Sequence, residues 1–481
     1  MISERRELFE RTPVLKAILK VSLPSIFSQI IIVLYNMADT LYIGLSESDV
    51  MLTAVSICAP IFTILTAISN LFGIGASSLM ARFLGKHDHT NAKKTTAFAF
   101  WGCLTSTIIY CLLVLVLMRP LINVIGGSHP EVFEHARKYL ITTVVCGGLF
   151  TTLSSFFAHL IRAEGKSLEA TMGLMLGGLL NIALDPFFMF VVFPRGEEVF
   201  AAGFASALSN VISLAYYVII LGRTKKDKRI VTITPSKAMF DKDIMRQVLL
   251  IGTPACLMTL CENISFAVLD GLMYSYGTAA QAGLGVSKKV NMLAHSMVRG
   301  MAQGVLPLIA YNYGSGKRKR MKKIVYTSTS ISLLMACICT LINCLCAKTL
   351  ISFFIRTGGE SVEFGATFLM ILSIGAPFSA VAYSVISFFQ AVNKPFRSTL
   401  LALMRKGILD IPLMFILNVA IATKGNGLVY ATPIADIACC LLAIGLFTYY
   451  LHYHSHDREV EHVQDVAMLD DESGEAQQSA E

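Results

Sequence analysis

The chain has 481 residues, of which 54% are hydrophobic and only 15% are charged, and its mean hydropathy is +0.63. A soluble protein of this length has no core large enough to hide so much apolar surface, so the composition excludes a soluble globular protein. The net charge of +8 does not indicate a nucleic-acid partner, because the basic residues lie on short connectors rather than on one folded face. The composition therefore predicts an all-α membrane protein.

Residues 1–19 have mixed charge and are expected to form a short cytoplasmic segment, with no cleavable signal sequence. About twenty apolar residues cross the hydrocarbon layer as a helix, and runs of that length bounded by polar loops occur twelve times. They are residues 20–44, 50–81, 95–118, 136–160, 168–192, 199–222, 247–275, 283–312, 324–347, 362–391, 398–422 and 428–452. The runs 283–312 and 398–422 contain charged residues, and we assign them as helices because an internal repeat requires six helices in each half.

The repeat relates two stretches of about twenty residues that lie 229 positions apart. Its members are Gly75, Leu79, Ala81, Gly85, Lys93 and Lys94, which reappear as Gly304, Leu308, Ala310, Gly314, Lys322 and Lys323. The repeat predicts an N-terminal six-helix lobe over residues 20–222, a charged cytoplasmic linker over 223–246 and a C-terminal six-helix lobe over 247–452. Duplicated membrane units of this kind are typical of transporters.

The basic residues predict the orientation, because cytoplasmic loops hold the excess of lysine and arginine. An N-terminus inside the cell places about 28 of the 40 basic residues in cytoplasmic segments, so both termini are expected in the cytoplasm. Residues 453–481 are polar and acidic and predict a disordered cytoplasmic tail. Nearly all twelve cysteines lie in apolar runs and show no zinc-type spacing, so we interpret them as small hydrophobic residues.

Ionisable and amide groups within the apolar runs are the candidate functional residues, since a charge in the membrane is costly without a use or a partner. Asn181 and Asp185 lie four residues apart, hence on one helix face, and Pro186 leaves a backbone carbonyl of the same turn without a donor. Carboxylate, amide and free carbonyl together indicate a site for a proton or a cation such as sodium. The alternative is an aspartate that caps a broken helix or bonds to a neighbouring backbone.

Asp39 is a second candidate, with Tyr35 and Asn36 on the same side of its helix. The alternative is a solvated residue at the outer end of that helix. Were Asp39 and Asp185 to form one site, both carboxylates could not stay charged without a cation, so the pair would take up a proton or bind a small ion.

Glu262 is the carboxylate near the middle of the seventh predicted helix, and Arg299 lies near mid-depth on the eighth. They are either a C-terminal-lobe contact for substrate or ion, or a neutralising ion pair, in which case Glu262 would bind a cation only weakly. Asp270, Asp410 and Asp436 also lie in or near helices, and Asp410 is a candidate partner of a nearby basic residue.

Several short stretches occur in the order found in one transporter family. They are Leu34-Tyr35-Asn36 with Asp39, Ala81-Arg82-Phe83-Leu84-Gly85, Arg162-Ala163-Glu164-Gly165, Asn181-Ile182-Ala183-Leu184-Asp185-Pro186, Tyr311-Asn312-Tyr313-Gly314 and Phe389-Gln390-Ala391. Together they resemble the bacterial members of the multidrug and toxic compound extrusion (MATE) family over about residues 10–452.

The resemblance implies twelve transmembrane helices in two pseudo-symmetric six-helix lobes around a central cavity. It also implies export of organic, often cationic, compounds driven by inward sodium ions or protons, with no other cofactor. Asp39, Asn181 and Asp185 match the family's cation site, and Glu262 matches an acidic residue of some members. Asn210 stands where many members have a threonine, and because an amide carbonyl can still bind a cation, Asn210 is also expected in the cation-coupling site. Ser379 stands where one branch has an aspartate, which favours coupling through the N-terminal lobe.

The sequence thus predicts a multidrug exporter of the bacterial plasma membrane that acts on small organic compounds, contacts lipid and is not an enzyme. The alternative is a flippase for a lipid-linked or other amphipathic substrate, for which we expect extra helices and a strongly basic cavity. A prenyltransferase-like enzyme would need paired acidic motifs at helix ends, but the adjacent aspartates Asp470 and Asp471 lie in the tail. Sodium and proton coupling, the substrate range and the oligomeric state all stay open at this point.

Overall fold

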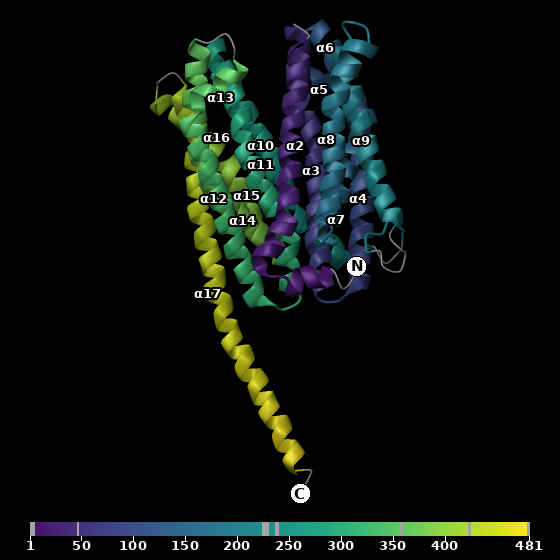
Figure 1. Ribbon diagram of the computed structural model, residues 1–481, viewed down its shortest axis with the longest axis vertical. Coiled ribbons are helices and arrows are strands. Elements are labelled where there is room, and N and C mark those ends of the chain that lie inside the picture. The colour runs from purple at the N-terminus through teal and green to yellow at the C-terminus, as the bar shows by residue number, and fades with distance from the viewer. Residues whose placement is uncertain are drawn as a thin grey trace.

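The computed structural model describes residues 5–45, 48–223, 230–235, 240–355, 359–421 and 425–478, with the backbone alone for residues 40, 49 and 454–478. All regular elements in these ranges are helices, and they form two lobes that lie side by side and diverge toward the upper end in Figure 1. The all-helical fold class expected from the sequence is therefore confirmed.

The N-terminal lobe is formed by the first half of the chain, preceded by a short π-helix. Its elements are η1 (Glu7–Arg11), α2 (Val14–Gly44), α3 (Asp49–Gly85), α4 (His89–Val116), α5 (Met118–Val124), α6 (Pro130–Leu140), η2 (Ile141–Cys146), α7 (Gly148–Ala163), α8 (Ser167–Phe187), η3 (Phe188–Val192) and α9 (Glu198–Arg223).

The C-terminal lobe follows the same plan. Its elements are α10 (Lys242–Met273), η6 (Tyr274–Tyr276), α11 (Thr278–Gly314), α12 (Arg318–Leu345), α13 (Ala347–Phe354), α14 (Glu360–Ala391), α15 (Pro395–Leu403), η7 (Met404–Ile408), α16 (Asp410–Ala420) and α17 (Asn426–Gln478).

Nine helices of the described chain are individually long and apolar enough to cross a membrane, and a tenth is obtained if α6–η2 and α7, bent by 47°, count as one span. The predicted run 283–312 is the continuous helix α11, whose lysines and arginine lower its hydropathy. The predicted run 398–422 is divided into α15, η7 and α16, because a π-helical turn interrupts the α-helical register at Met404–Ile408.

The last helix, α17, continues beyond the predicted span 428–452 to Gln478. The disordered state of residues 453–481 stays a prediction.

Glycine-mediated contacts join the two lobes and reproduce the sequence repeat. A Cβ added at Gly85 would lie 2.2 Å from the carbonyl oxygen of Tyr311, and one at Gly314 would lie 2.2 Å from that of Arg82. The same offset of 229 residues relates Arg82 to Tyr311 and Gly85 to Gly314. The two contacts are therefore equivalent under a pseudo-twofold axis, and they hold α3 and α11 close together at the lower end.

Two further interlobe crossings, α3 with α10 and α2 with α11, also depend on glycine. A Cβ at Gly252 of α10 would lie 1.7 Å from the carbonyl oxygen of Leu71, and one at Gly300 of α11 would lie 2.5 Å from Cα of Ile26. The helices α2, α3, α10 and α11 consequently form the central layer between the lobes.

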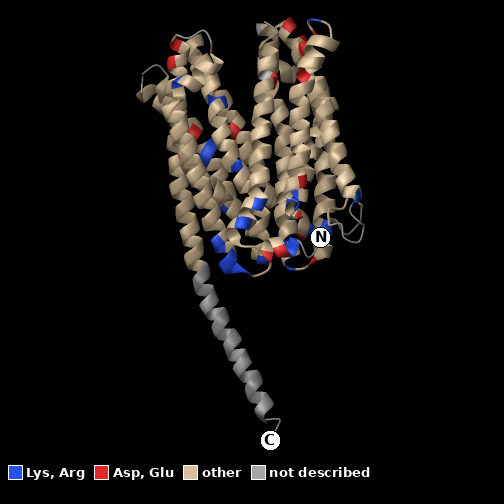
Figure 2. Cartoon of the chain, in the orientation of Figure 1, with Lys and Arg blue, Asp and Glu red and all other residues tan. Residues whose placement is uncertain are grey.

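The N-terminus lies at the lower end of the bundle and α17 runs out from the same end (Figure 1), and lysine and arginine gather at that end (Figure 2). Residues 224–229 and 236–239 of the predicted linker 223–246 lie outside the described residues. The described segment 230–235 packs on the N-terminal lobe, because the backbone N–H groups of Ile230 and Val231 donate to Oε1 of Glu164 at 3.3 and 3.1 Å.

Candidate functional site

The N-terminal-lobe candidates come from two helices that a glycine brings together. Gly178 of α8 faces α2, where an added Cβ would lie 2.6 Å from Cγ2 of Ile31 and 3.2 Å from Cδ1 of Tyr35. Asn181 and Asp185 follow Gly178 by three and seven residues and so lie on the same face of α8. Close packing at this glycine therefore directs the polar groups of α8 toward α2.

Asn181 and Asp185 form the pair expected from their spacing. The Asn181 side chain is buried and its Nδ2 donates to Oδ1 of Asp185 at 2.7 Å. The same nitrogen lies 3.3 Å from Oγ of Ser206 on α9, a residue that the sequence analysis missed. Because the amide uses its donor on one carboxylate oxygen only, the second oxygen of Asp185 is left for another partner.

Two carboxylate oxygens at this site are buried without a hydrogen-bond partner among the described residues. They are Oδ1 of Asp39 and Oδ2 of Asp185. The two carboxylates act on each other electrostatically, and both also interact electrostatically with Tyr35 and Tyr139. The structure thus brings Asp39 and Asp185 into one polar region, from α2 and α8, and leaves in it two acceptors without donors.

A lysine of the opposite lobe also acts on this region. Lys289 of α11 attracts Asp39 electrostatically, an interaction between lobes that no local sequence pattern indicated. Asn210, by contrast, donates its amide nitrogen to the backbone carbonyl of Ser206 at 2.8 Å within α9. Its nitrogen is therefore used inside its own helix, and Ser206 is the α9 side chain that contacts Asn181.

Glu262 and Arg299 of the C-terminal lobe form an ion pair. Nη2 of Arg299 donates to Oε2 of Glu262 at 2.6 Å and lies 3.3 Å from the hydroxyl of Tyr383 on α14. Of the two expectations for these residues, the structure contains the neutralising ion pair. Glu262 is consequently a poorer ligand for an added cation than Asp39 or Asp185.

Further ion pairs lie inside the C-terminal lobe. Arg405 pairs with Asp436 at 2.8 Å and Lys406 with Asp410 at 3.1 Å, all four side chains being buried. Lys288 bonds Asp270. Ser379 donates to a carbonyl of its own helix, at 2.9 Å from the oxygen of Ala376. Each of these ion pairs joins one basic and one acidic side chain, so the pairs add no net charge to the second lobe.

A central cavity of about 140 Å³ lies between the lobes. Both lobes line it, with α2, α3, α7 and α8 on one side and α10, α11 and α14 on the other. The polar residues that line it are Gln29, Thr66, Asn70, Ser155, His159, Arg162, Thr259, Glu262, Arg299, Gln303, Tyr383, Ser387 and Gln390. Of the predicted site residues, Glu262 and Arg299 line this cavity, whereas Asp39 and Asp185 do not.

Polar contacts cross from lobe to lobe at the cavity wall. Nε2 of Gln29 donates to Oε1 of Gln303 at 3.2 Å, and Nδ2 of Asn70 donates to Oγ1 of Thr259 at 2.9 Å. Ile32 of α2 also lines the cavity, and Asp39 follows it by seven residues, or two helical turns. The helix α2 therefore carries both a wall of the cavity and one of the two buried acids.

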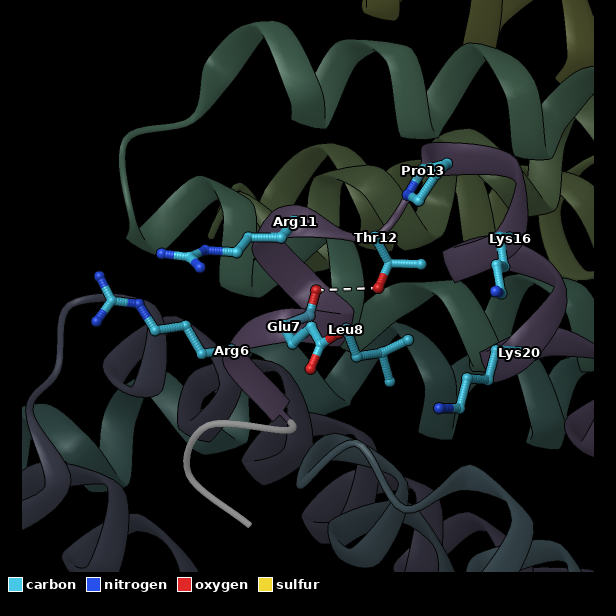
Figure 3. Close-up of a pocket in the computed structure, with 8 residues that line it drawn as sticks. All are labelled: Arg6, Glu7, Leu8, Arg11, Thr12, Pro13, Lys16 and Lys20. Carbon is cyan, nitrogen blue, oxygen red and sulfur yellow. Dashed lines mark hydrogen bonds between the residues drawn. The ribbon is translucent and has the colours of Figure 1, made fainter.

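A wider hollow of about 630 Å³ lies at the lower end, in the elbow between η1 and α2 (Figure 3). Its lining residues are Arg6, Glu7, Leu8, Arg11, Thr12, Pro13, Lys16 and Lys20. All of them come from the first twenty residues, and none is a predicted site residue or belongs to the second lobe. The smaller interlobe cavity is therefore the better candidate site.

The segment η1 itself is tied to the second lobe. Oε1 of Glu10 accepts from the Tyr311 hydroxyl at 2.7 Å, and Oε2 of Glu10 lies 2.5 Å from Nζ of Lys317. Burial raises the pKa of Glu10, but hydrogen bonds from Lys317 and Tyr311 outweigh this and lower it to about 2. Glu10 is therefore ionised at neutral pH and fastens the N-terminus to α11 and the turn that follows it.

Two pseudo-symmetric helical lobes, an interlobe cavity and unpartnered acids within the apolar part define the class of membrane transporters. A family model described as MatE matches residues 24–187 and again 254–416, one match in each lobe. The chain therefore belongs to the MatE family, whose members are transporters rather than enzymes. The resemblance drawn from the sequence motifs is confirmed.

Individual relatives agree with this assignment. The chain is 27% identical to the multidrug export protein MepA of Staphylococcus aureus (strain MRSA252), over 92% of this chain and 96% of that protein. It is 26% identical to MepA of Staphylococcus saprophyticus, with the same coverage.

Solved structures share the fold. A MATE-family multidrug resistance transporter in its outward-facing conformation has a TM-score of 0.81 and 21% identity, covering 93% of this chain and 98% of that one. A MOP-superfamily transporter from Pyrococcus furiosus has a TM-score of 0.80 and 22% identity, covering 91% and 95%. That protein is described as having a binding pocket of reverse polarity that suggests a different function.

Proposed function

We propose that this chain is a secondary multidrug exporter of the bacterial plasma membrane, with both termini in the cytoplasm. It moves hydrophobic organic compounds outward in exchange for inward sodium ions or protons. The observation that carries the proposal is the pair of buried carboxylate oxygens without donors, on Asp39 and Asp185. The export activity of the MepA relatives and the outward-facing fold of the structural relative support it.

The charge of the two acids determines what the site takes up. A buried carboxylate without a donor is unfavourable, and two of them near each other repel. A proton or a sodium ion relieves both costs, and Asn181 supplies an amide oxygen next to Asp185 as a further ligand. The acids Asp39 and Asp185, with Asn181, thus form the coupling site, and the ion that they take up is a proton or sodium.

Binding of an ion at this site affects the cavity through α2, because this helix contributes to both. The position of α2 relative to α8 depends on the charge between Asp39 and Asp185, and the same helix bonds the second lobe through Gln29 and Gln303. An ion and a substrate that favour opposite arrangements of the lobes exchange across the membrane by alternating access. The contacts of Gln29 with Gln303 and of Asn70 with Thr259 are the ones that open when the lobes rearrange.

The test is efflux of a rhodamine dye that carries a carboxylate from proteoliposomes under a sodium gradient or a proton gradient, each imposed alone. We expect one gradient to drive efflux by the wild type, and we expect Asp185→Asn and Asp39→Asn to abolish this driven efflux. Glu363→Gln is the matched control, since Glu363 is an exposed carboxylate in the first turn of α14. Driven efflux that survives both aspartate substitutions would contradict the proposed coupling site.

The same vesicles distinguish the alternative function. Flipping of a lipid-linked or other amphipathic substrate without movement of the dye, under either gradient, would replace multidrug export by a flippase on this fold. In that case dithionite quenching of a fluorescent lipid analogue would report the transport.

A further inference from the structure

The central cavity carries an unbalanced positive charge. Besides Tyr383, four ionisable side chains line it within the described residues, namely His159, Arg162, Glu262 and Arg299. Glu262 is neutralised by Arg299 at 2.6 Å, so this pair contributes no net charge. Arg162 has no carboxylate within ion-pair distance in the described chain, and it is therefore the residue that sets the polarity of the cavity.

Arg162 lies near the C-terminal end of α7 and its side chain is only 2% exposed. Its Nε and Nη2 atoms are buried without a hydrogen-bond partner. The acidic residue nearest in sequence, Glu164, is engaged elsewhere, because it accepts from two backbone N–H groups of the linker and pairs with Lys166 at 3.3 Å. A buried guanidinium without a counter-charge is costly, so Arg162 calls for a partner that the chain itself does not supply.

The other unpartnered atoms of the cavity lining have the same chemistry. Nε of Arg299 and Nε2 of Gln390 are also buried without a partner. With the two nitrogens of Arg162, the buried polar atoms of the lining that lack partners in the described residues are all hydrogen-bond donors. An acceptor-rich group of negative charge would satisfy them, whereas a cation would add a second positive charge beside Arg162.

We propose that Arg162 binds an anionic group, of the carboxylate or sulfonate type, on the compounds that this transporter carries. This inference rests on the proposed function and names the substrate class of its cavity. The rest of such a compound is apolar, because Leu174, Met258 and Ile386 also line the cavity. The cavity of about 140 Å³ is smaller than the roughly 300–1,000 Å³ of drug-sized pockets, so it holds the anionic end of the compound.

The alternative role of Arg162 is structural. A cation near the end of α7 stabilises the exposed carbonyls and the dipole of that helix. Lysine at the same position keeps this effect and the positive charge, but it loses the planar guanidinium that bonds a carboxylate through two parallel N–H groups. A purely structural arginine affects all ligands alike, whereas an anchoring arginine affects those that carry the anion.

The test compares a rhodamine dye that has a free benzoate carboxylate with the methyl ester of the same dye, which lacks the anionic group. Binding of both dyes to the purified full-length protein is measured by fluorescence polarisation. We expect the wild type to bind the acid more tightly than the ester. Arg162→Gln should weaken binding of the acid by roughly tenfold to hundredfold, the range of a charge-assisted hydrogen bond, and should change binding of the ester by less than about twofold.

Arg162→Lys should retain part of the preference for the acid, and Arg195→Gln, at an exposed arginine between η3 and α9, should leave both dyes unchanged. A wild type that binds the ester as tightly as the acid would overturn the inference without any variant. Equal losses for both dyes in Arg162→Gln would assign Arg162 a structural role instead. Gradient-driven transport is scored separately, so loss of coupling with an intact preference for the acid would count against the proposed function alone.

Discussion

Gly252→Ala tests how the two lobes are held together. The added Cβ would lie 1.7 Å from the Leu71 carbonyl oxygen, which is backbone and has no rotamer by which to move aside. An ordinary contact of about 3.5 Å requires α3 and α10 to separate by roughly 1.8 Å. Overpacking of this kind costs about 1–3 kcal/mol and here exceeds the gain of about 1 kcal/mol in helix propensity, so the net effect is destabilising.

Gly271→Ala is the matched control on the same helix, because no atom lies within 4 Å of a Cβ added at Gly271. We expect the midpoint of thermal unfolding in detergent to fall for Gly252→Ala and to stay or rise for Gly271→Ala. Amide hydrogen exchange should increase in α10 and α3 for the first variant, since a loss of about 1–3 kcal/mol changes an opening equilibrium by roughly 5- to 150-fold. Equal behaviour of the two variants would refute the close-packed interlobe crossing.

Three further predictions follow from particular contacts. Burial raises the pKa of Glu10, but Lys317 outweighs this and lowers the pKa to about 2, below its ordinary value of 4.5. Ionised Glu10 therefore stabilises the fold above pH 4.5, and this stabilisation is lost as the pH falls toward 2. The difference in melting temperature between wild type and Glu10→Gln should shrink over that range. Arg405→Met should destabilise the protein by about 3–5 kcal/mol, because it leaves Asp436 buried without its partner, and adding Asp436→Leu should restore most of the melting temperature. Gly178→Val should push α2 away from α8 and reduce gradient-driven efflux while the far-ultraviolet circular dichroism stays helical, and efflux at the wild-type rate would count against the packing described for this pair of helices.

Features that depend on spacing along one helix were predictable from the sequence. The separation of four residues between Asn181 and Asp185 fixes a common face, and the structure has them bonded. The offset of 229 residues predicted equivalent positions in two lobes, and the mirrored contacts of Gly85 and Gly314 are its physical consequence.

Features that depend on contacts between distant helices were not predictable in the same way. The attraction between Lys289 and Asp39 acts between α11 and α2, and the orientation of helices in different lobes is not encoded in a local period. Arg162 has no carboxylate partner because Glu164 bonds elsewhere. The partner of Glu164 is the linker backbone at Val231, which no side-chain motif indicates. The π-helix η7 likewise leaves no pattern in the hydropathy of residues 398–422.

Ion counterflow driven by a substrate is the most direct measurement of the central claim that Asp39 and Asp185 couple export to a cation. Proteoliposomes are loaded with an organic dye and with a fluorescent reporter of either pH or sodium, and no ion gradient is imposed. The account predicts that outward movement of the dye drives protons or sodium ions inward through the wild type, and that neither Asp39→Asn nor Asp185→Asn supports this ion movement. Export of the dye without any ion movement, or ion movement that persists in both variants, would contradict it.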